Sequence, residues 1–201
     1  MHPMANKLPW HLNDVVDTVF VNISDKIEPW LFVAGITPNH VTLSSFGFLG
    51  WFFWCIWTSQ FKLAAALLVF IYFTDCLDGH YARKYNMLSV LGDVLDHVRD
   101  WIMAGVTTVL MVTHPSIPTT SKLALAPIGA LGLLTGLLYT GAVEIYAVRK
   151  STPSLSIVRR ITYAFGIRTK EDATKWLHRV LRWSGTGVSC IVFACMFLII
   201  D

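Results

Sequence analysis

Five long apolar segments constrain this chain more than any other feature of its sequence. They cover residues 41–59, 63–82, 101–113, 123–148 and 184–200 of the 201 residues, and the third is long enough to cross a membrane only if it starts near Leu88. A helix needs about 20 apolar residues to span the hydrocarbon core of a bilayer. Because 54% of the residues are hydrophobic and only 14% are charged, the sequence predicts an all-α, polytopic transmembrane helical bundle of five to six spans.

The length suits a single membrane domain over residues 1–201, with the bundle in 38–201. Residues 1–37 lack the basic start and apolar core of a signal peptide, so we expect the first span to act as its own insertion signal. Apolar residues recur there at helical spacing, at Val15, Val16, Val19, Phe20, Ile23, Ile27 and Leu31. This spacing predicts an amphipathic helix in the membrane interface, which Pro29 should bend or end.

Basic residues predict the orientation of the bundle. Thirteen Lys and Arg lie in the N-terminal stretch, the turn at 83–88 and the connection at 149–182, whereas Lys62 and Lys122 alone lie on the opposite side. By the positive-inside rule, the first three regions are cytoplasmic. The connection at 149–182 also carries Trp176, so we expect an interfacial helix there. A basic collar is ordinary in a membrane protein, and no nucleic acid partner is expected.

An acidic run interrupts the apolar pattern. Residues 75–100 contain five aspartates, namely Asp75, Asp78, Asp93, Asp96 and Asp100. An aspartate near the centre of a spanning helix costs about 2.5–3.5 kcal/mol, so the five together cost on the order of 12–17 kcal/mol if nothing compensates them. The sequence therefore predicts bound cations at this point, and divalent metal is the strongest candidate.

The spacing of the aspartates predicts that they converge. Asp75 and Asp78 share one face of the second span, and Asp96 and Asp100 share one face of the third. Because the turn between these spans is short, we expect antiparallel neighbours with facing acidic stripes and a cluster of four carboxylates. Oxygen ligands of this kind suit Mg²⁺, Mn²⁺ or Ca²⁺. Arg99 should pair with Asp96 or Asp75, and a phosphate-binding role for it is the alternative.

At this point the residues carry a family resemblance. The signature positions are Asp75, Asp78, Gly79, Ala82, Arg83, Gly92, Asp96 and Asp100. Their identities and spacing resemble the complete signature of the CDP-alcohol phosphotransferases. Thr37-Pro38-Asn39-His40-Val41-Thr42 before the first span is similar to the Pro-Asn-x-x-Thr motif of that family. The resemblance covers residues 38–100 and continues beyond them only in hydropathy. The family core has six spans, whereas five are counted here.

The resemblance implies transfer of a substituted phosphate from a CDP-linked donor to an alcohol, with release of CMP, in phospholipid synthesis. Carried over by position, Asp75, Asp78, Asp96 and Asp100 would hold two divalent ions, Mg²⁺ or Mn²⁺, on the donor diphosphate. Gly79 and Ala82 would line the cytidine pocket, Arg83 would hold a phosphate, and Asn39 would belong to the same nucleotide site. The family also implies lipid or alcohol acceptors, a membrane setting and a possible homodimer.

Two further residues narrow the branch. Asp93 and His97 follow Gly92 and Asp96, a pattern that resembles the choline and ethanolamine phosphotransferases and predicts transfer to diacylglycerol. There, Asp93 would orient His97 as the general base, while Asp100 is the family's usual candidate. Asp78-Gly79-His80 instead resembles the phosphatidylinositol synthases, so a CDP-diacylglycerol donor with an inositol or glycerol phosphate acceptor remains the alternative.

A rival from another class is a cation channel or transporter, since intramembrane carboxylates also mark ion paths. Such a path predicts acidic residues spread along a pore. In this chain they are confined to one pair of helices, which favours the enzyme.

Overall fold

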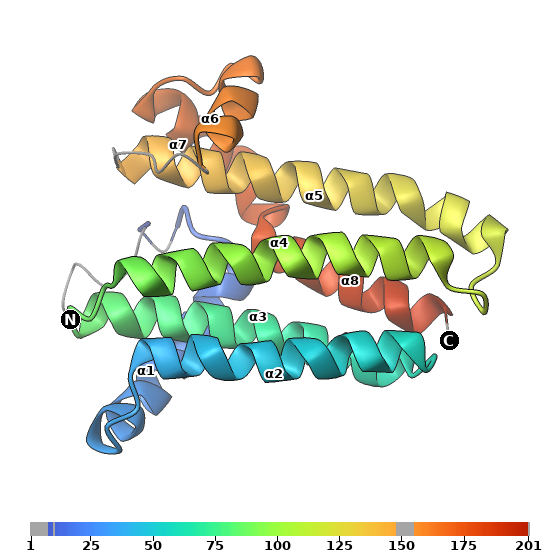
Figure 1. Cartoon of the computed structure of the whole chain (residues 1–201). Coiled ribbons are helices and arrows are strands. Elements are labelled where there is room, and N and C mark those ends of the chain that lie inside the picture. The colour runs from blue at the N-terminus through green and yellow to red at the C-terminus, as the bar shows by residue number, and fades with distance from the viewer. Residues whose placement is uncertain (1–7, 10, 148–154, 201) are drawn as a thin grey trace.

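The computed structural model describes residues 8–9, 11–147 and 155–200, and the described residues form helices joined by short connections. Lys7, Arg149 and Lys150, which count toward the basic collar, lie outside the described residues. The long helices are α2 (Pro38–Trp57), α3 (Phe61–Lys84), α4 (Val90–Thr113), α5 (Thr119–Ala147) and α8 (Thr186–Ile200). They run side by side as one bundle (Figure 1). The predicted all-α class is therefore confirmed.

Local sequence sets the start of the helices that carry the aspartates. Pro38 occupies the first turn of α2, where its missing N–H costs nothing, and the Thr37 N–H donates to His40 Nδ1 at 3.1 Å. Asn86 adopts a left-handed φ of 56° in the turn between α3 and α4, a conformation that Asn tolerates better than most residues. Ser89 then caps α4 by accepting a hydrogen bond from the Gly92 N–H at 2.9 Å.

Two apolar clusters hold the bundle together. The first joins α2, α3 and α8 and includes Phe52, Ile71 and Phe197. The second joins α5 to the helices that follow it and includes Leu138 and Leu177. Gly129 and Gly132 of α5 face Phe193 of α8, where a Cβ would lie 3.5 and 3.2 Å from the ring. These glycines thus allow α5 to pack closely on α8 within the bundle.

The helix α4 lies differently from the expectation. It packs mainly against α2, and its backbone approaches α3 little. Arg99 is its one buried residue, while Trp101 and Val109 are exposed, as they would be against lipid. The acidic residues of α3 and α4 are therefore connected through side chains, chiefly that of Arg99, rather than by close packing of the two helices.

The N-terminal helix α1 (Val15–Val33) continues through Pro29, so the proline does not end it. Its buried residues are Ser24 and Glu28, whereas Trp30 and Val33 are 77% and 85% exposed. Ser24 and Glu28 therefore face the bundle together with Phe20, which packs on Tyr72 and Phe73, while Asp25 and Lys26 are exposed. The interfacial position of this helix stays a prediction, and the exposed Trp30 and Val33 are the side chains that it would present to lipid.

The basic connection contains two helices where one was expected, α6 (Leu155–Ala164) and α7 (Lys170–Arg179), followed by the short helix η1 (Leu181–Trp183). α6 and α7 pack on α5 near the end of the bundle that also holds the turn between α3 and α4 (Figure 1). Lys62 and Lys122 lie in the first turns of α3 and α5, at the opposite end. The basic regions thus gather at one end, as the charge pattern predicts.

Two helical segments of the described residues, Thr119–Ala147 and Leu181–Ile200, are long and apolar enough to cross a membrane by length and hydropathy alone. α3 and α4 carry charged residues within their length, including the aspartates of the acidic run. The count of five to six spans stays a prediction.

Candidate active site

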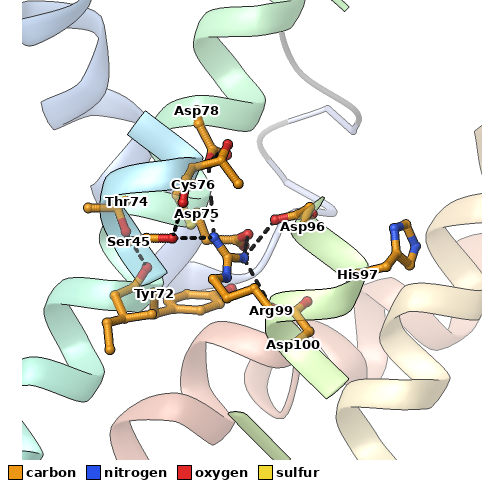
Figure 2. Close-up of polar contacts among 12 residues, drawn as sticks. Ser45, Tyr72, Thr74, Asp75, Cys76, Asp78, Asp96, His97, Arg99 and Asp100 are labelled. Carbon is orange, nitrogen blue, oxygen red and sulfur yellow. Dashed lines mark hydrogen bonds and ion pairs between the residues drawn. The ribbon is translucent and has the colours of Figure 1, made fainter. Parts of the chain in front are cut away.

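The acidic run brings three aspartates together (Figure 2). Asp75 and Asp78 project from α3 and Asp96 from α4, and each offers an oxygen within 4.8 Å of the other two. Asp78 is buried, while the side chains of Asp75 and Asp96 are 28% and 38% exposed. The predicted convergence of α3 and α4 carboxylates is therefore present in the structure, with one side of the group open.

Arg99 lies at the centre of this group and is 1% exposed. Its Nη2 donates to Asp75 Oδ1, to Asp96 Oδ1 at 2.6 Å and to Asp100 Oδ1 at 3.0 Å. Asp100 thus joins the group through Arg99, with its own side chain 55% exposed. Arg99 pairs with both of the aspartates that the sequence offered as alternatives. It supplies the positive charge that carboxylates require at this depth.

Two hydroxyl groups from α2 complete the group, and sequence reasoning did not select them. Thr42 Oγ1 donates to Asp78 Oδ2 at 2.6 Å, and Ser45 Oγ accepts from Arg99 Nη1 at 3.4 Å. Both side chains are buried. Thr42 ends the Pro-Asn-x-x-Thr motif, which was the available signal for it. Ser45 follows three residues later on the same helical face, and the packing of α4 on α2 gives it a partner.

His97 and Asp93 lie outside the group. Figure 2 shows the His97 ring pointing away from the aspartates that surround Arg99. His97 Nδ1 lies 2.6 Å from the Asp93 carbonyl oxygen and 4.0 Å from its carboxylate, and the Asp93 side chain is 56% exposed. The expected orientation of the imidazole by the carboxylate is thus replaced by a hydrogen bond to the backbone of the preceding helical turn.

The remaining signature residues line the end of α3. A Cβ on Gly79 would lie 3.2 Å from Arg83 Nη1, so the guanidinium lies against the bare backbone there. Ala82 and Arg83 are both partly exposed in the last turn of α3. The last turn of α3, which follows Asp78, is therefore partly accessible to a ligand.

Asn39 connects the starts of α2 and α4. Its Oδ1 accepts a hydrogen bond from Ser89 Oγ at 3.0 Å, and a Cβ on Gly92 would lie only 2.7 Å from the same oxygen. Gly92 therefore permits a close approach of Asn39, and a Cβ there would require the Asn39 or Ser89 side chain to shift. Asn39 lies at the same end of the bundle as the last turn of α3, where the resemblance puts the nucleotide (Figure 1).

Polar side chains of α1 pair with residues of α3 and α5. Glu28, fully buried, lies 2.6 Å from His80 Nδ1 and 3.0 Å from Lys84 Nζ. Asp17 accepts hydrogen bonds from Tyr72 and Tyr139, and burial together with the nearby Asp14 carboxylate raises its pKa to about 7. The contacts with Tyr72, His80 and Lys84 hold α1 against α3, and the contact with Tyr139 joins α1 to α5.

The donor set suits a hard divalent cation. Carboxylate oxygens are the ligands that Mg²⁺ and Mn²⁺ prefer, and oxygens on opposite sides of an Mg²⁺ ion lie about 4 Å apart. The oxygens of Asp75, Asp78 and Asp96 already lie within 4.8 Å of one another. A second trio, Asp25, Glu28 and His80, is equally close, and in both groups a basic side chain, Lys84 or Arg99, pairs with the acidic residues. The first group has three carboxylates where the second has two and a histidine, so its oxygens are the better donor set for Mg²⁺ or Mn²⁺.

Comparison with known proteins agrees with this site. Residues 35–168 match the CDP-alcohol phosphatidyltransferase family, and the chain belongs to it. The match covers both acidic helices and extends well past the signature into α5 and α6. The predicted family is therefore confirmed.

Several curated proteins are similar to parts of the chain. A CDP-diacylglycerol–glycerol-3-phosphate 3-phosphatidyltransferase of Rickettsia typhi is 34% identical over 56 residues, 28% of this chain and 32% of the relative. A second such protein, from Arabidopsis thaliana, is 37% identical over 67 residues, 31% of this chain and 26% of the relative. A cardiolipin synthase (CMP-forming) / mitochondrial hydrolase fusion protein of Schizosaccharomyces pombe is 34% identical over 110 residues, 55% of this chain and 17% of the relative.

The chain thus spans about a third of the length of the first relatives it matches. No solved structure matches it.

Proposed function

We propose that the chain is a metal-dependent phosphatidyltransferase of phospholipid synthesis, which moves a phosphatidyl group from CDP-diacylglycerol to a polar alcohol and releases CMP. The observation that carries this proposal is the convergence of Asp75, Asp78 and Asp96 within a complete eight-position signature. The names of the relatives favour CDP-diacylglycerol as donor and glycerol 3-phosphate as acceptor. This reverses the order of the two substrate hypotheses that the sequence raised.

Asp75, Asp78, Asp96 and Asp100 would hold two divalent ions, Mg²⁺ or Mn²⁺, which when bound supply positive charge to the donor diphosphate. The closeness of the first three carboxylates supports this assignment. Arg83, at the accessible end of α3, would hold a phosphate oxygen with its planar fork of N–H donors. Gly79 and Ala82 leave room beside it for the cytidine, and Asn39 offers an amide at the start of α2.

The transfer needs one proton acceptor. The oxygen of the acceptor hydroxyl forms a bond to the phosphorus that carries diacylglycerol, the phosphoanhydride bond to CMP breaks, and the hydroxyl proton goes to a base. We propose Asp100 for this role, because its carboxylate borders the group and is exposed on the open side. His97 points away from the group, which weakens the alternative that it is the base.

The proposed orientation has the site facing the cytoplasm. The basic last turn of α3 and the basic helices α6 and α7 lie at the same end of the bundle as the signature residues (Figure 1). A cysteine introduced at Asn86, in the exposed turn between α3 and α4, should react with a membrane-impermeant thiol reagent only from the cytoplasmic side. Reaction from the other side alone would contradict this orientation.

The choline and ethanolamine hypothesis remains the second candidate, favoured by the Asp93 and His97 pattern. A donor panel separates the two. Purified protein with Mg²⁺ is given CDP-diacylglycerol with glycerol 3-phosphate or inositol, and separately CDP-choline or CDP-ethanolamine with diacylglycerol, and CMP release is measured. We expect CMP only from CDP-diacylglycerol. Release from CDP-choline or CDP-ethanolamine alone would reverse the assignment, and release from no donor would contradict the proposed activity. Membership in the family disfavours the ion-channel alternative.

A further inference from the structure

Arg99 contacts every aspartate of the candidate metal site. Its Nη2 is shared among Asp75, Asp96 and Asp100, and its Nη1 lies 3.9 Å from Asp78 Oδ2. Arg99 is buried, and Figure 2 shows its guanidinium among the aspartates. The cationic group is therefore in direct contact with the oxygens that a divalent cation would use.

A guanidinium and a divalent cation cannot share these oxygens without cost. Ligand oxygens lie 2.0–2.6 Å from Mg²⁺, Mn²⁺ or Ca²⁺, roughly, so an ion bound to them would lie within a few ångströms of the Nη2 atom. An arginine side chain keeps its proton in proteins, so no change of pH near neutrality removes this repulsion. Metal binding requires the guanidinium to shift.

The present contacts of Arg99 leave it able to take a new partner. Among the described residues its Nε has no hydrogen-bond partner, although only 1% of the Arg99 surface is exposed. Within residues 8–9, 11–147 and 155–200, its Nη1 has two longer contacts, to Ser45 at 3.4 Å and to Asp78 at 3.9 Å. Arginine binds phosphate in a bidentate manner, so a diphosphate at the open side of the site would satisfy donors that the aspartates leave unused.

We propose that Arg99 is a built-in competitor of the divalent cation, and that the donor diphosphate relieves this competition by drawing the guanidinium away from the aspartates. The proposal rests on the proposed function, because it takes the aspartates as metal ligands. Metal and donor then bind cooperatively. Since such coupling is reciprocal, each should tighten the binding of the other by the same factor.

The test measures Mn²⁺ binding rather than turnover. The full chain in detergent micelles is titrated with Mn²⁺, and free Mn²⁺ is followed by its electron paramagnetic resonance signal, without and with CDP and with allowance for chelation by CDP itself. Arg99→Gln removes the charge but keeps a polar side chain. Arg159→Gln is the matched control, because Arg159 is exposed on α6 and bonds Tyr163.

We expect Arg99→Gln to bind Mn²⁺ at least about tenfold more tightly than the wild type without CDP, because a repelling charge in contact with the ligands is gone. CDP should tighten Mn²⁺ binding strongly in the wild type and in Arg159→Gln, and much less in Arg99→Gln. Equal or weaker Mn²⁺ binding by Arg99→Gln would overturn the proposal.

Asp78→Asn distinguishes a failure of the competition by Arg99 from a failure of the metal site itself. Mn²⁺ binding that depends on Asp78 but is not tightened by Arg99→Gln overturns the competition alone. Absence of Asp78-dependent binding in every variant overturns both the competition and the metal site. If Arg99→Gln does not fold, Arg99→Lys carries the test, because lysine keeps the charge but lacks the fork for phosphate. CDP should then tighten Mn²⁺ binding less than in the wild type, and equal tightening would overturn the proposal.

Discussion

The hydrogen bond from Thr42 to Asp78 offers a sharp test of how α2 supports the site. Thr42→Val keeps the branched shape of the side chain and removes only the hydroxyl group that donates to Asp78 Oδ2 at 2.6 Å. Both residues are buried, 3% and 5% exposed, so water does not readily replace the lost donor. A hydrogen bond to a charged group contributes about 1.5–3 kcal/mol.

At about 1.36 kcal/mol for each factor of ten, that range corresponds to a roughly 10- to 150-fold effect. We expect it as a rise in the Mn²⁺ concentration needed for half-maximal CMP release, because Asp78 loses the contact that orients it toward the other aspartates. Thr42→Ser keeps the hydroxyl and should stay close to the wild type. Thr108→Val removes an exposed hydroxyl of α4 that bonds its own helix, and should change nothing. Equal Mn²⁺ requirements for Thr42→Val and Thr42→Ser would refute the positioning role of the hydroxyl.

Three further outcomes follow from the structure. His97→Gln should keep most of its turnover, because the ring points away from the aspartates, and a dead variant would restore His97 as the base. Gly92→Ala should impair CMP release, since its Cβ would lie 2.7 Å from Asn39 Oδ1, whereas Gly105→Ala, on an open face of α4, should not; equal activities would contradict the close approach. As the pH rises from 5 to 8, the melting temperature of Asp17→Asn should fall less than that of the wild type. The raised pKa of Asp17 means that the folded state favours its protonated form, so the wild type loses stability as pH rises from about 4 through 7; parallel melting curves would contradict this.

The sequence predicted the acidic group well because its information is local. Residues three and four apart on a helix share a face, so the spacing of Asp75 and Asp78 could be interpreted without a structure. The charge of Arg99 inside the same run likewise required an acidic partner nearby. These features depend on the period of the helix and on the cost of burying charge, and both are visible along the chain.

The remaining features depend on packing, which the sequence does not show. The short turn between α3 and α4 suggested close neighbours, but α4 packs on α2, and this gives Ser45 its contact with Arg99. The packing of α2 on α3 brings Thr42 to Asp78. The direction of His97 depends on whether its ring bonds the Asp93 carboxylate or the Asp93 backbone, and the spacing of the residues is the same in both cases. The continuation of α1 through Pro29 also depends on packing. A proline weakens a helix by itself, but Glu28 beside it contacts His80 of α3, and the helix continues.

The central claim is that the aspartates of α3 and α4 support metal-dependent transfer from a CDP-linked lipid. The most direct measurement is CMP release from CDP-diacylglycerol and glycerol 3-phosphate by the wild type, by Asp78→Asn and by Asp172→Asn, each with Mg²⁺ and with excess chelator. Asp172 caps α7 far along the chain and is the matched control for the same chemical change. We expect release by the wild type and by Asp172→Asn with Mg²⁺, and none with chelator or from Asp78→Asn. Release that survives the chelator, or that Asp78→Asn retains in full, would contradict the claim.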